Sequence, residues 1–206
     1  GQMTQVDKRM LDSEEDIATY FLGSILSGGG SVPDDNTTKG WVNMVNRYQT
    51  QALSTRLKIP LIYGIDAVHG HSNVVGATIF PQNIGLGCAN DPELIYKINQ
   101  ATAVEVAATG LHWTFSPCIT VPKDDRWGRQ YEGFSESTSL VTRLTHAAIT
   151  GYEDKLAKVN GRKIAACAKH FIGDGGTSWE TGTLQEGMHT YKIDRGNTDI
   201  TEEELR

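Results

Sequence analysis

The hydrophobic and polar positions in the first third of the chain predict two helices, each followed by a strand. Residues 12–22 open with an acidic turn and predict a helix, and residues 24–26 follow as a short strand. The second helix is predicted by apolar side chains at helical spacing, namely Trp41, Val45, Tyr48 and Ala52. Residues 61–65 form an apolar run of strand length, so Asp66 is expected at the carboxyl end of that strand.

The rest of the chain continues this alternation. Asn90 or Asp91 can cap a third helix, which Pro92 opens and Gly110 follows. Four further elements are expected in chain order: an extended stretch at 111–120, a helix at 135–151, a buried strand at 163–169, and a capping-box helix start at 201–204. Strands and helices alternate in this way when helical crossovers join parallel strands.

Two architectures share this alternation, a doubly wound sheet and a (β/α)8 TIM-type barrel. A dinucleotide-binding doubly wound sheet is expected to carry G-x-G-x-x-G after a strand, with an acidic residue about twenty positions on, and this sequence has no such motif. The α/β barrel is therefore favoured. The pattern supplies about four to five βα units, whereas a closed barrel has eight and typically about 250 residues. Residues 1–206 are accordingly expected to be the N-terminal part of a barrel domain, with later strands and a second domain absent.

Ionisable residues gather where the expected strand at 163–169 ends. Lys169 and His170 follow the small apolar run, and a glycine-rich loop with Asp174 comes next. Ligand sites of parallel α/β folds lie at the carboxyl ends of the strands, where Asp66 and the region of Ser116 are also expected. Because buried charges need partners, Lys169 and His170 indicate either a satisfied polar network or a site for a polar ligand. The local pattern favours neither.

Composition narrows the class of partner. The chain of 206 residues is 38% hydrophobic, and its formal net charge is −6. Nucleic acids and anionic membranes require concentrated positive charge, so neither is expected as a partner, and a small polar ligand fits better. Cys88, Cys118 and Cys167 are odd in number and widely spaced, which favours buried free thiols over a disulfide framework or a zinc set. The first residues resemble the inside of a longer segment, so a periplasmic or secreted location is expected if a leader was removed.

Four separated motifs occur in an order that resembles a known enzyme family. They are YGIDAVHGH at 63–71, ATIFP at 77–81, RWGR at 126–129 and KHFIGDG at 169–175. Together they resemble the N-terminal catalytic domain of family 3 glycoside hydrolases, in the branch of β-glucosidases and exo-β-glucanases, over residues 1–206. The resemblance implies hydrolysis of O-glycosyl bonds that releases terminal non-reducing β-D-glucose from β-glucosides or β-glucans, by a retaining mechanism and without a cofactor.

By motif, the resemblance assigns sugar binding to four residues: Asp66, Arg129, Lys169 and His170. A carboxylate can accept hydrogen bonds from two ring hydroxyls, whereas Arg and Lys donate to hydroxyl oxygens. The family often has a cis peptide bond between its Lys and His, which is expected here between Lys169 and His170. A retaining enzyme needs two carboxyl groups about 5 Å apart. No residue here matches either one, so no catalytic residue is expected in this chain; the nucleophilic Asp and the acid/base Glu are expected beyond Arg206.

Simpler interpretations exist for the same residues. Asp66 can be a turn residue, and Arg129 can be a structural partner of a carboxylate at 124, 125 or 132, a role for which Arg126 is the better candidate. Asp174 is more typical of a tight turn than of a catalytic group. The related N-acetylglucosaminidases have a His at the position of Asp174, which disfavours that branch.

Two other classes of protein compete with the glycosidase interpretation. In a metal-dependent amidohydrolase-like barrel, His69 and His71 would bind the metal after their strand, with Lys169 and His170 completing the set. The resemblance already explains these residues, so metal binding is not expected. In a non-catalytic carbohydrate-binding or assembly module, a complementary half-barrel chain or self-association would cover the exposed edge of the partial barrel.

Overall fold

The chain forms an open parallel sheet with helices packed against one side. The computed structural model describes residues 4–183, 185–187 and 189–205. Adjacent strands of the sheet are parallel, in the order β1 (Gln5–Asp7), β2 (Ser24–Ser27), β3 (Ile62–Ile65) and β4 (Trp113–Thr114). The spatial order follows the chain order without the reversal that defines a doubly wound sheet, which agrees with the barrel interpretation.

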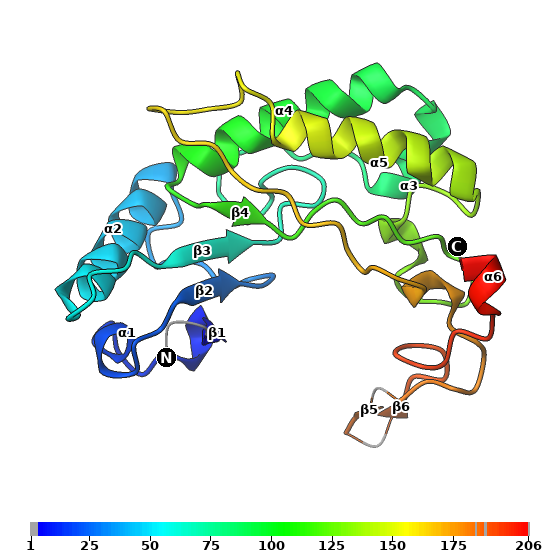
Figure 1. Cartoon of the computed structure of the whole chain (residues 1–206), viewed down its shortest axis with the longest axis horizontal. Coiled ribbons are helices and arrows are strands. Elements are labelled where there is room, and N and C mark those ends of the chain that lie inside the picture. The colour runs from blue at the N-terminus through cyan, green and yellow to red at the C-terminus, as the bar shows by residue number, and fades with distance from the viewer. Residues whose placement is uncertain (1–3, 184, 188, 206) are drawn as a thin grey trace.

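The helices connect these strands and extend beyond them (Figure 1). They are α1 (Asp16–Thr19), α2 (Thr38–Ser54), α3 (Asn83–Ala89), α4 (Pro92–Ala108), α5 (Thr138–Tyr152) and α6 (Glu202–Leu205). Short 3-10 turns occur at η1 (Lys8–Met10), η2 (Gln130–Glu132) and η3 (Asp174–Gly176), and a two-stranded antiparallel ribbon pairs β5 (Gln185–Glu186) with β6 (His189–Thr190). Figure 1 shows α2, α4 and α5 on one side of the sheet, and β5 and β6 in a segment that hangs away from it.

The cap predicted for the third helix is present. Asp91 Oδ1 accepts hydrogen bonds from the backbone N–H groups of Glu93 and Leu94, at 3.0 and 3.1 Å, and Pro92 occupies the first turn of α4. These bonds satisfy two donors that the first turn of a helix leaves without a backbone partner. The predicted capping box is also confirmed, because Thr201 and Glu204 exchange side chain–backbone hydrogen bonds at the start of α6.

Two helices differ from the prediction. The helix expected over 12–22 is limited to the four residues of α1, because the Asp16 carboxylate accepts hydrogen bonds from the N–H groups of Asp12 and Ser13 and holds those residues in a turn. Helix α3 was not predicted, since its glycines hide the apolar spacing. One of them, Gly87, is required by close packing, because a Cβ there would lie 1.7 Å from the backbone oxygen of Phe134.

The segment 163–169 pairs with β4 but is not the buried strand that the sequence predicted. Ala165 lies opposite Trp113 and Lys169 opposite Cys118, both in parallel bridges. Ile164 is buried, whereas Ala165 and Ala168 are exposed. Among the described residues no strand pairs with the outer edge of this segment, so its side chains stay partly open to solvent.

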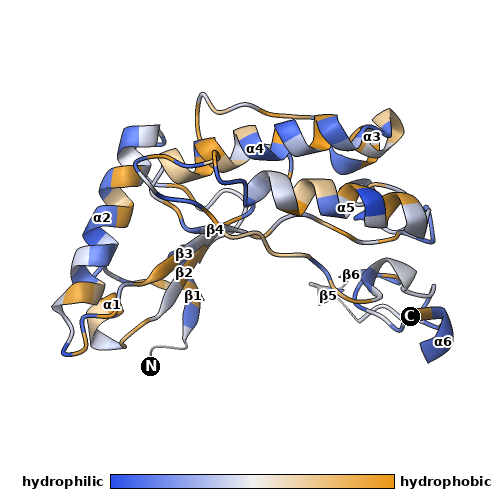
Figure 2. Cartoon of the chain, turned by 45° about the horizontal axis from the view of Figure 1, so that its top comes forward, coloured by the Kyte–Doolittle hydropathy of each residue, from blue (hydrophilic) through white to orange (hydrophobic). Residues whose placement is uncertain are grey.

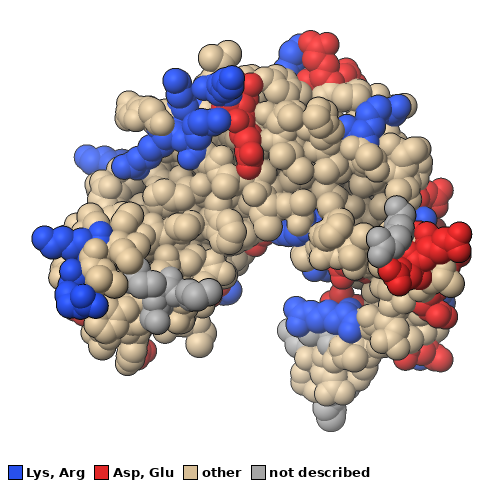
Figure 3. All heavy atoms as spheres, in the orientation of Figure 1, with Lys and Arg blue, Asp and Glu red and all other residues tan. Residues whose placement is uncertain are grey.

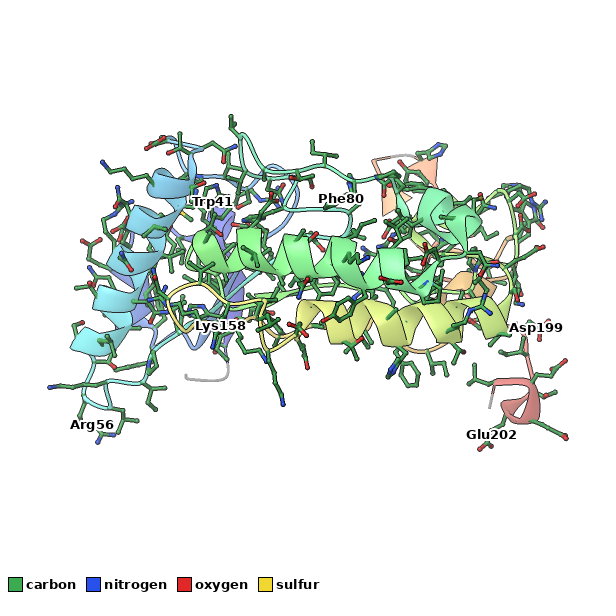
Figure 4. All side chains as sticks on the ribbon, turned by 90° about the horizontal axis from the view of Figure 1, so that it is seen from above. Trp41, Arg56, Phe80, Lys158, Asp199 and Glu202 are labelled. Atoms are coloured by element: carbon green, nitrogen blue, oxygen red, sulfur yellow. The ribbon has the colours of Figure 1, made fainter. Side chains whose placement is uncertain are left out.

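Two hydrophobic clusters stabilise the layers. The larger one joins the sheet to α2 and the end of α4, and Trp41, Ile25 and Tyr63 are fully buried in it. Figure 4, which views the helices from above, shows Trp41 where α2 meets α4. The smaller cluster lies among α3, α4 and α5, around Ile95 and Leu144. Hydrophilic and hydrophobic residues alternate along α2 (Figure 2), and the buried ones include Trp41, Val45 and Tyr48.

The cysteine prediction holds for one residue of three. Cys118 is buried, Cys167 is half-buried and Cys88 is exposed, and all three are free thiols. Cys88 is exposed because it lies on the outer face of the short helix α3, away from the smaller cluster. The prediction of a buried thiol at that position was therefore wrong.

Candidate functional site

Lys169 and Asp66 meet although 103 positions separate them. Lys169 Nζ donates a 2.6 Å hydrogen bond to Asp66 Oδ1. Asp66 directly follows β3, and Lys169 ends the segment that pairs alongside β4, so both lie at the carboxyl ends of parallel strands. The Lys169 side chain is 16% exposed and the Asp66 side chain 36%. The ammonium is therefore mostly covered, while the carboxylate keeps an open side that can accept further hydrogen bonds.

The loop after β3 fixes the backbone that carries Asp66. Asn73 Nδ2 donates to the backbone oxygen of Asp66 at 3.3 Å, and the next residue, Ala67, donates its N–H to Thr114 Oγ1 at 3.2 Å. The loop turns at Gly70, where φ is +101° and a Cβ would lie 2.1 Å from the backbone oxygen of Thr78. Only glycine fits that turn.

Arg129 is paired with Glu132, the carboxylate three residues later. Arg129 Nε and Nη2 donate to the two carboxylate oxygens of Glu132 at 2.6 and 2.8 Å. These hydrogen bonds raise the pKa of Arg129. Burial opposes ionisation of Glu132, yet the bonds from Arg129 hold the pKa of Glu132 below its usual value. The guanidinium and the carboxylate therefore form a fixed, fully ionised pair.

A buried thiol lies behind this pair. Cys118 Sγ donates a weak hydrogen bond to Glu132 Oε2, at 3.5 Å. Burial raises the pKa of the Cys118 thiol to about 12, so the sulfur stays protonated and can act as that donor. The thiol therefore adds a third, weaker donor to the Glu132 carboxylate, beside the two from Arg129.

His170 contacts Arg129 from the other direction. Arg129 Nη2 lies 3.2 Å from His170 Nε2, and a guanidinium can only donate, so Nε2 accepts and the proton resides on Nδ1. His170 Nδ1 is 3.1 Å from Asp174 Oδ2, but neither atom has an aligned hydrogen-bond partner. Burial, and then the positive charge of Arg129, lower the pKa of His170, which favours this neutral form. The peptide bond between Lys169 and His170 is cis, as predicted.

A hollow of about 470 Å³ opens at these strand ends. Three of the four residues expected to bind sugar line it: Asp66, Arg129 and Lys169. His170 does not line it and instead borders a neighbouring apolar groove. The other residues that line the hollow are Gly29, Val68, His69, Ser72, Asn73, Gln82, Tyr131 and Glu132. Figure 3 shows the molecule as an arch whose concave side lies between the N-terminal elements and the segment that carries β5 and β6.

The two histidines of the rival metal site are engaged elsewhere. His69 Nδ1 is 2.8 Å from the backbone oxygen of Phe80, and Gln82 donates to His69 Nε2 at 3.1 Å. His71 is fully buried and bonds to Thr109 Oγ1 at 2.9 Å. In the described part of the chain, no group of three His, Cys, Asp or Glu residues could hold a metal ion. The set of ligands that an amidohydrolase-like barrel would use is not assembled.

Sequence reasoning missed one functional contact. The sequence offers Glu132 only as one of three possible carboxylate partners of Arg129, and the structure makes it the bidentate partner. Arg126 pairs instead with Asp124, at 2.5 and 2.8 Å, as expected. The turn expected at Asp174 is also present, as the 3-10 turn η3. The spacing of three residues between Arg129 and Glu132 was the available signal, because it suits a single 3-10 turn.

The sheet and the hollow define a β/α-barrel type of protein with a polar hollow at the carboxyl ends of its strands. More particularly, the chain belongs to glycosyl hydrolase family 3, because the model of that family's N-terminal domain matches residues 1–206. The predicted family and barrel-type fold are thereby confirmed, with the described part of the chain forming part of the barrel. None of the described helices combines the length and the apolar character needed to cross a membrane.

Similar proteins with known names are β-glucosidases and exo-β-glucanases. A lysosomal β-glucosidase of Dictyostelium discoideum is 33% identical over 84% of this chain. A mutant exo-1,3/1,4-β-glucanase of a Pseudoalteromonas species is 42% identical, with a TM-score of 0.85 over 100% of this chain. A β-glucosidase of Listeria innocua in complex with glucose is 29% identical over 89% of this chain, with a TM-score of 0.66. The chain spans 24%, 32% and 26% of these proteins, respectively.

Proposed function

We propose that the protein to which this chain contributes is a β-glucosidase that releases terminal non-reducing β-D-glucose from β-glucosides or β-glucans. The observation that carries the proposal is the convergence of Asp66, Lys169 and Arg129 on one hollow of about 470 Å³ at the strand ends. Many pockets for small ligands have volumes from about 300 Å³ upward. The names of the similar proteins, and the glucose complex of the relative from Listeria innocua, support the same class of substrate.

Each residue has a defined part in the proposed binding of glucose. Asp66 accepts hydrogen bonds from two adjacent hydroxyls through the open side of its carboxylate. Lys169 holds that carboxylate in place through the 2.6 Å contact, and donates to a hydroxyl oxygen. Arg129 donates its remaining N–H groups, and His170, which contacts Arg129 from outside the hollow, positions the guanidinium. These contacts tighten as the sugar ring distorts toward the transition state.

The proposed reaction needs a pair of carboxyl groups about 5 Å apart for a retaining mechanism. In this proposal both belong to parts of the protein beyond Arg206, and residues 1–206 form the N-terminal part of the barrel domain. The apolar groove of about 510 Å³ beside His170 supports this division. Phe171 and Ile172, which line it, are 74% and 53% exposed, and the remaining barrel strands would cover them.

Calorimetric titration of D-glucose into this chain tests the binding part of the proposal. Lys169→Met removes a charged hydrogen-bond donor, so the dissociation constant for glucose is expected to rise about 10- to 100-fold. Lys163→Met is the matched control, because Lys163 is an exposed lysine of the same segment with no part in the hollow. Equal losses in both variants would contradict the assignment of Lys169.

An assay with an aryl β-glucoside tests whether the two catalytic carboxyl groups lie outside residues 1–206. Residues 1–206 alone are expected to release no aglycone above the uncatalysed rate, because both proposed carboxyl groups are outside this segment. Turnover by this chain above that rate, whether or not it survives Asp66→Asn, would place a catalytic carboxylate within residues 1–206 and would overturn the proposed position of the pair.

A further inference from the structure

One buried residue, Cys118, lies between the two cations that line the hollow. Through its backbone, Cys118 lies opposite Lys169 in a parallel bridge. The N–H of Lys169 donates to the backbone oxygen of Pro117 at 3.0 Å, and the N–H of Ile119 donates to the backbone oxygen of Lys169 at 2.6 Å. The residues on either side of Cys118 therefore fix the backbone from which the Lys169 side chain extends to the hollow.

The side chain of Cys118 supports the second cation, Arg129, through a carboxylate. Glu132 Oε2 accepts a hydrogen bond from Arg129 Nη2 at 2.8 Å and a weaker one from Cys118 Sγ at 3.5 Å. Glu132 Oε1 accepts from Arg129 Nε at 2.6 Å. A carboxylate held by donors from two residues cannot turn without losing one of them. The direction in which Arg129 presents its remaining N–H groups to the hollow is thereby tied to Cys118.

Packing alone is the simpler explanation for a buried cysteine, but the surroundings of Cys118 differ from those of a core thiol. Neither hydrophobic cluster of the described residues includes Cys118, although its side chain is fully buried. Its neighbours are charged instead, because Lys169, Glu132 and Arg129 all act on its pKa. An apolar side chain could fill the same space, but it would leave Glu132 with one donor fewer.

We propose that Cys118 is a positioning residue for sugar binding: its thiol fixes the carboxylate that holds Arg129, beside the backbone of Lys169. Cys118 touches no ligand itself, because its side chain is fully buried and does not line the hollow. The inference rests on the proposed function, since the affinity that Cys118 supports is the affinity for glucose in that hollow.

Calorimetric titration of D-glucose into variants at this position tests the proposal. Cys118→Ser keeps a donor for Glu132 in a similar volume, so its dissociation constant is expected to stay within about twofold of that of the unsubstituted chain. Cys118→Ala and Cys118→Val remove the donor with a smaller and a larger side chain, and each is expected to raise the constant about 3- to 10-fold. Cys167→Ala is the matched control, because Cys167 is a half-buried free thiol that does not line the hollow.

The pH dependence of glucose binding separates positioning from packing. Glu132 faces Arg129, Lys169, His170 and the thiol of Cys118; the hydrogen bonds from Arg129 and Cys118 lower its pKa, as does the charge of Lys169. Loss of the thiol in Cys118→Ala therefore raises the pKa of Glu132, and the affinity for glucose is expected to fall at a higher pH on acidification. Cys118→Ser is expected to keep the original profile. The other titrating groups around the hollow are the same in every variant.

The possible results separate this inference from the proposed function. If the unsubstituted chain binds no glucose, the proposed function fails, and the positioning role fails with it. If glucose binds and the Ala and Val variants bind it as tightly as Cys118→Ser, only the positioning role is overturned. Equal losses in Cys118→Ser and Cys118→Ala without a change in the pH profile, or the same loss in Cys167→Ala, would also overturn it. If Cys118→Ala does not fold, the comparison of Cys118→Ser with Cys118→Val decides in the same way.

Discussion

The N-terminal layer, formed by β1–β4 with α2 and α4, and the C-terminal segment, residues 170–205, use apolar side chains in opposite ways. In the N-terminal layer, Ile25, Tyr63 and Ile65 are completely buried between strands and helices. In the C-terminal segment, Phe171 and Ile172 are largely exposed. Most of the hydrophobic contribution to the free energy of folding therefore comes from the first region, whereas the second region carries apolar surface that its own residues do not cover.

The two regions are expected to differ most when one large side chain is truncated in each. Trp41→Ala removes a fully buried side chain and leaves a cavity, so the free energy of unfolding is expected to fall by about 3–5 kcal/mol. Phe171→Ala removes a side chain that is 74% exposed and is expected to change it by less than about 0.5 kcal/mol. Urea denaturation followed by circular dichroism measures both. Similar losses in the two variants would contradict the claim that only the N-terminal layer stabilises the fold through buried apolar side chains.

A second test uses pH and the buried His71 of the N-terminal layer. Burial lowers the pKa of His71 from 6.5 to about 4, and its Nδ1 atom has no partner, so the folded chain disfavours the charged imidazole. The stability that the neutral form contributes is present above pH 6.5 and is lost as the pH falls from 6.5 toward 4. At about 1.36 kcal/mol per pKa unit the total loss is about 3 kcal/mol.

The measurement is the free energy of unfolding at several pH values between about 7 and about 4. His71→Gln keeps a donor for Thr109 but cannot be protonated, so its stability is expected to fall less steeply over this range. The same slope in both proteins would show that other groups control the acid sensitivity of the N-terminal layer.

The smallest expected effects compare two helix caps. Asp91→Ala leaves two N–H groups of the 17-residue helix α4 without their side-chain acceptor, and it is expected to cost about 1 kcal/mol. Thr201→Ala removes the cap of α6, a four-residue helix in the C-terminal segment with no buried residue, and less than about 0.5 kcal/mol is expected. Thermal unfolding of the two variants measures both losses. A larger loss for Thr201→Ala would show that the C-terminal segment contributes more stability through its cap than α4 does.

The sequence predicted the helices whose ends and buried faces are set by residues close together in the chain. The cap at Asp91 and the helical spacing from Trp41 to Ala52 correspond to the observed helices α4 and α2. The position of Asp66 at a strand end followed from the apolar run before it. Its contact with Lys169 could be expected in general terms, since parallel strands bring their carboxyl ends to one side.

Other features could not be predicted because they depend on tertiary context. The exposure of the segment 163–169 depends on whether a further strand lies beside it, which its own small apolar residues cannot encode. Lys169 lines the hollow, whereas its neighbour His170 lines the apolar groove beside it. The sequence does not indicate to which side each of two adjacent residues points at the end of a strand. Helix α3 was missed because Gly85 and Gly87, which permit close packing, weaken the apolar pattern that marks a helix.

The adjacency of Lys169 and His170 has an evolutionary consequence. Lys169 donates a hydrogen bond to Asp66, and the next residue, His170, accepts one from Arg129. Two adjacent residues therefore contact two different parts of the chain. An insertion or deletion between these two residues would displace at least one contact, whereas a change of length within the exposed part of the loop around β5 and β6 would disturb neither. Among related sequences, gaps are therefore expected to accumulate in that loop and to be absent between the Lys and the His.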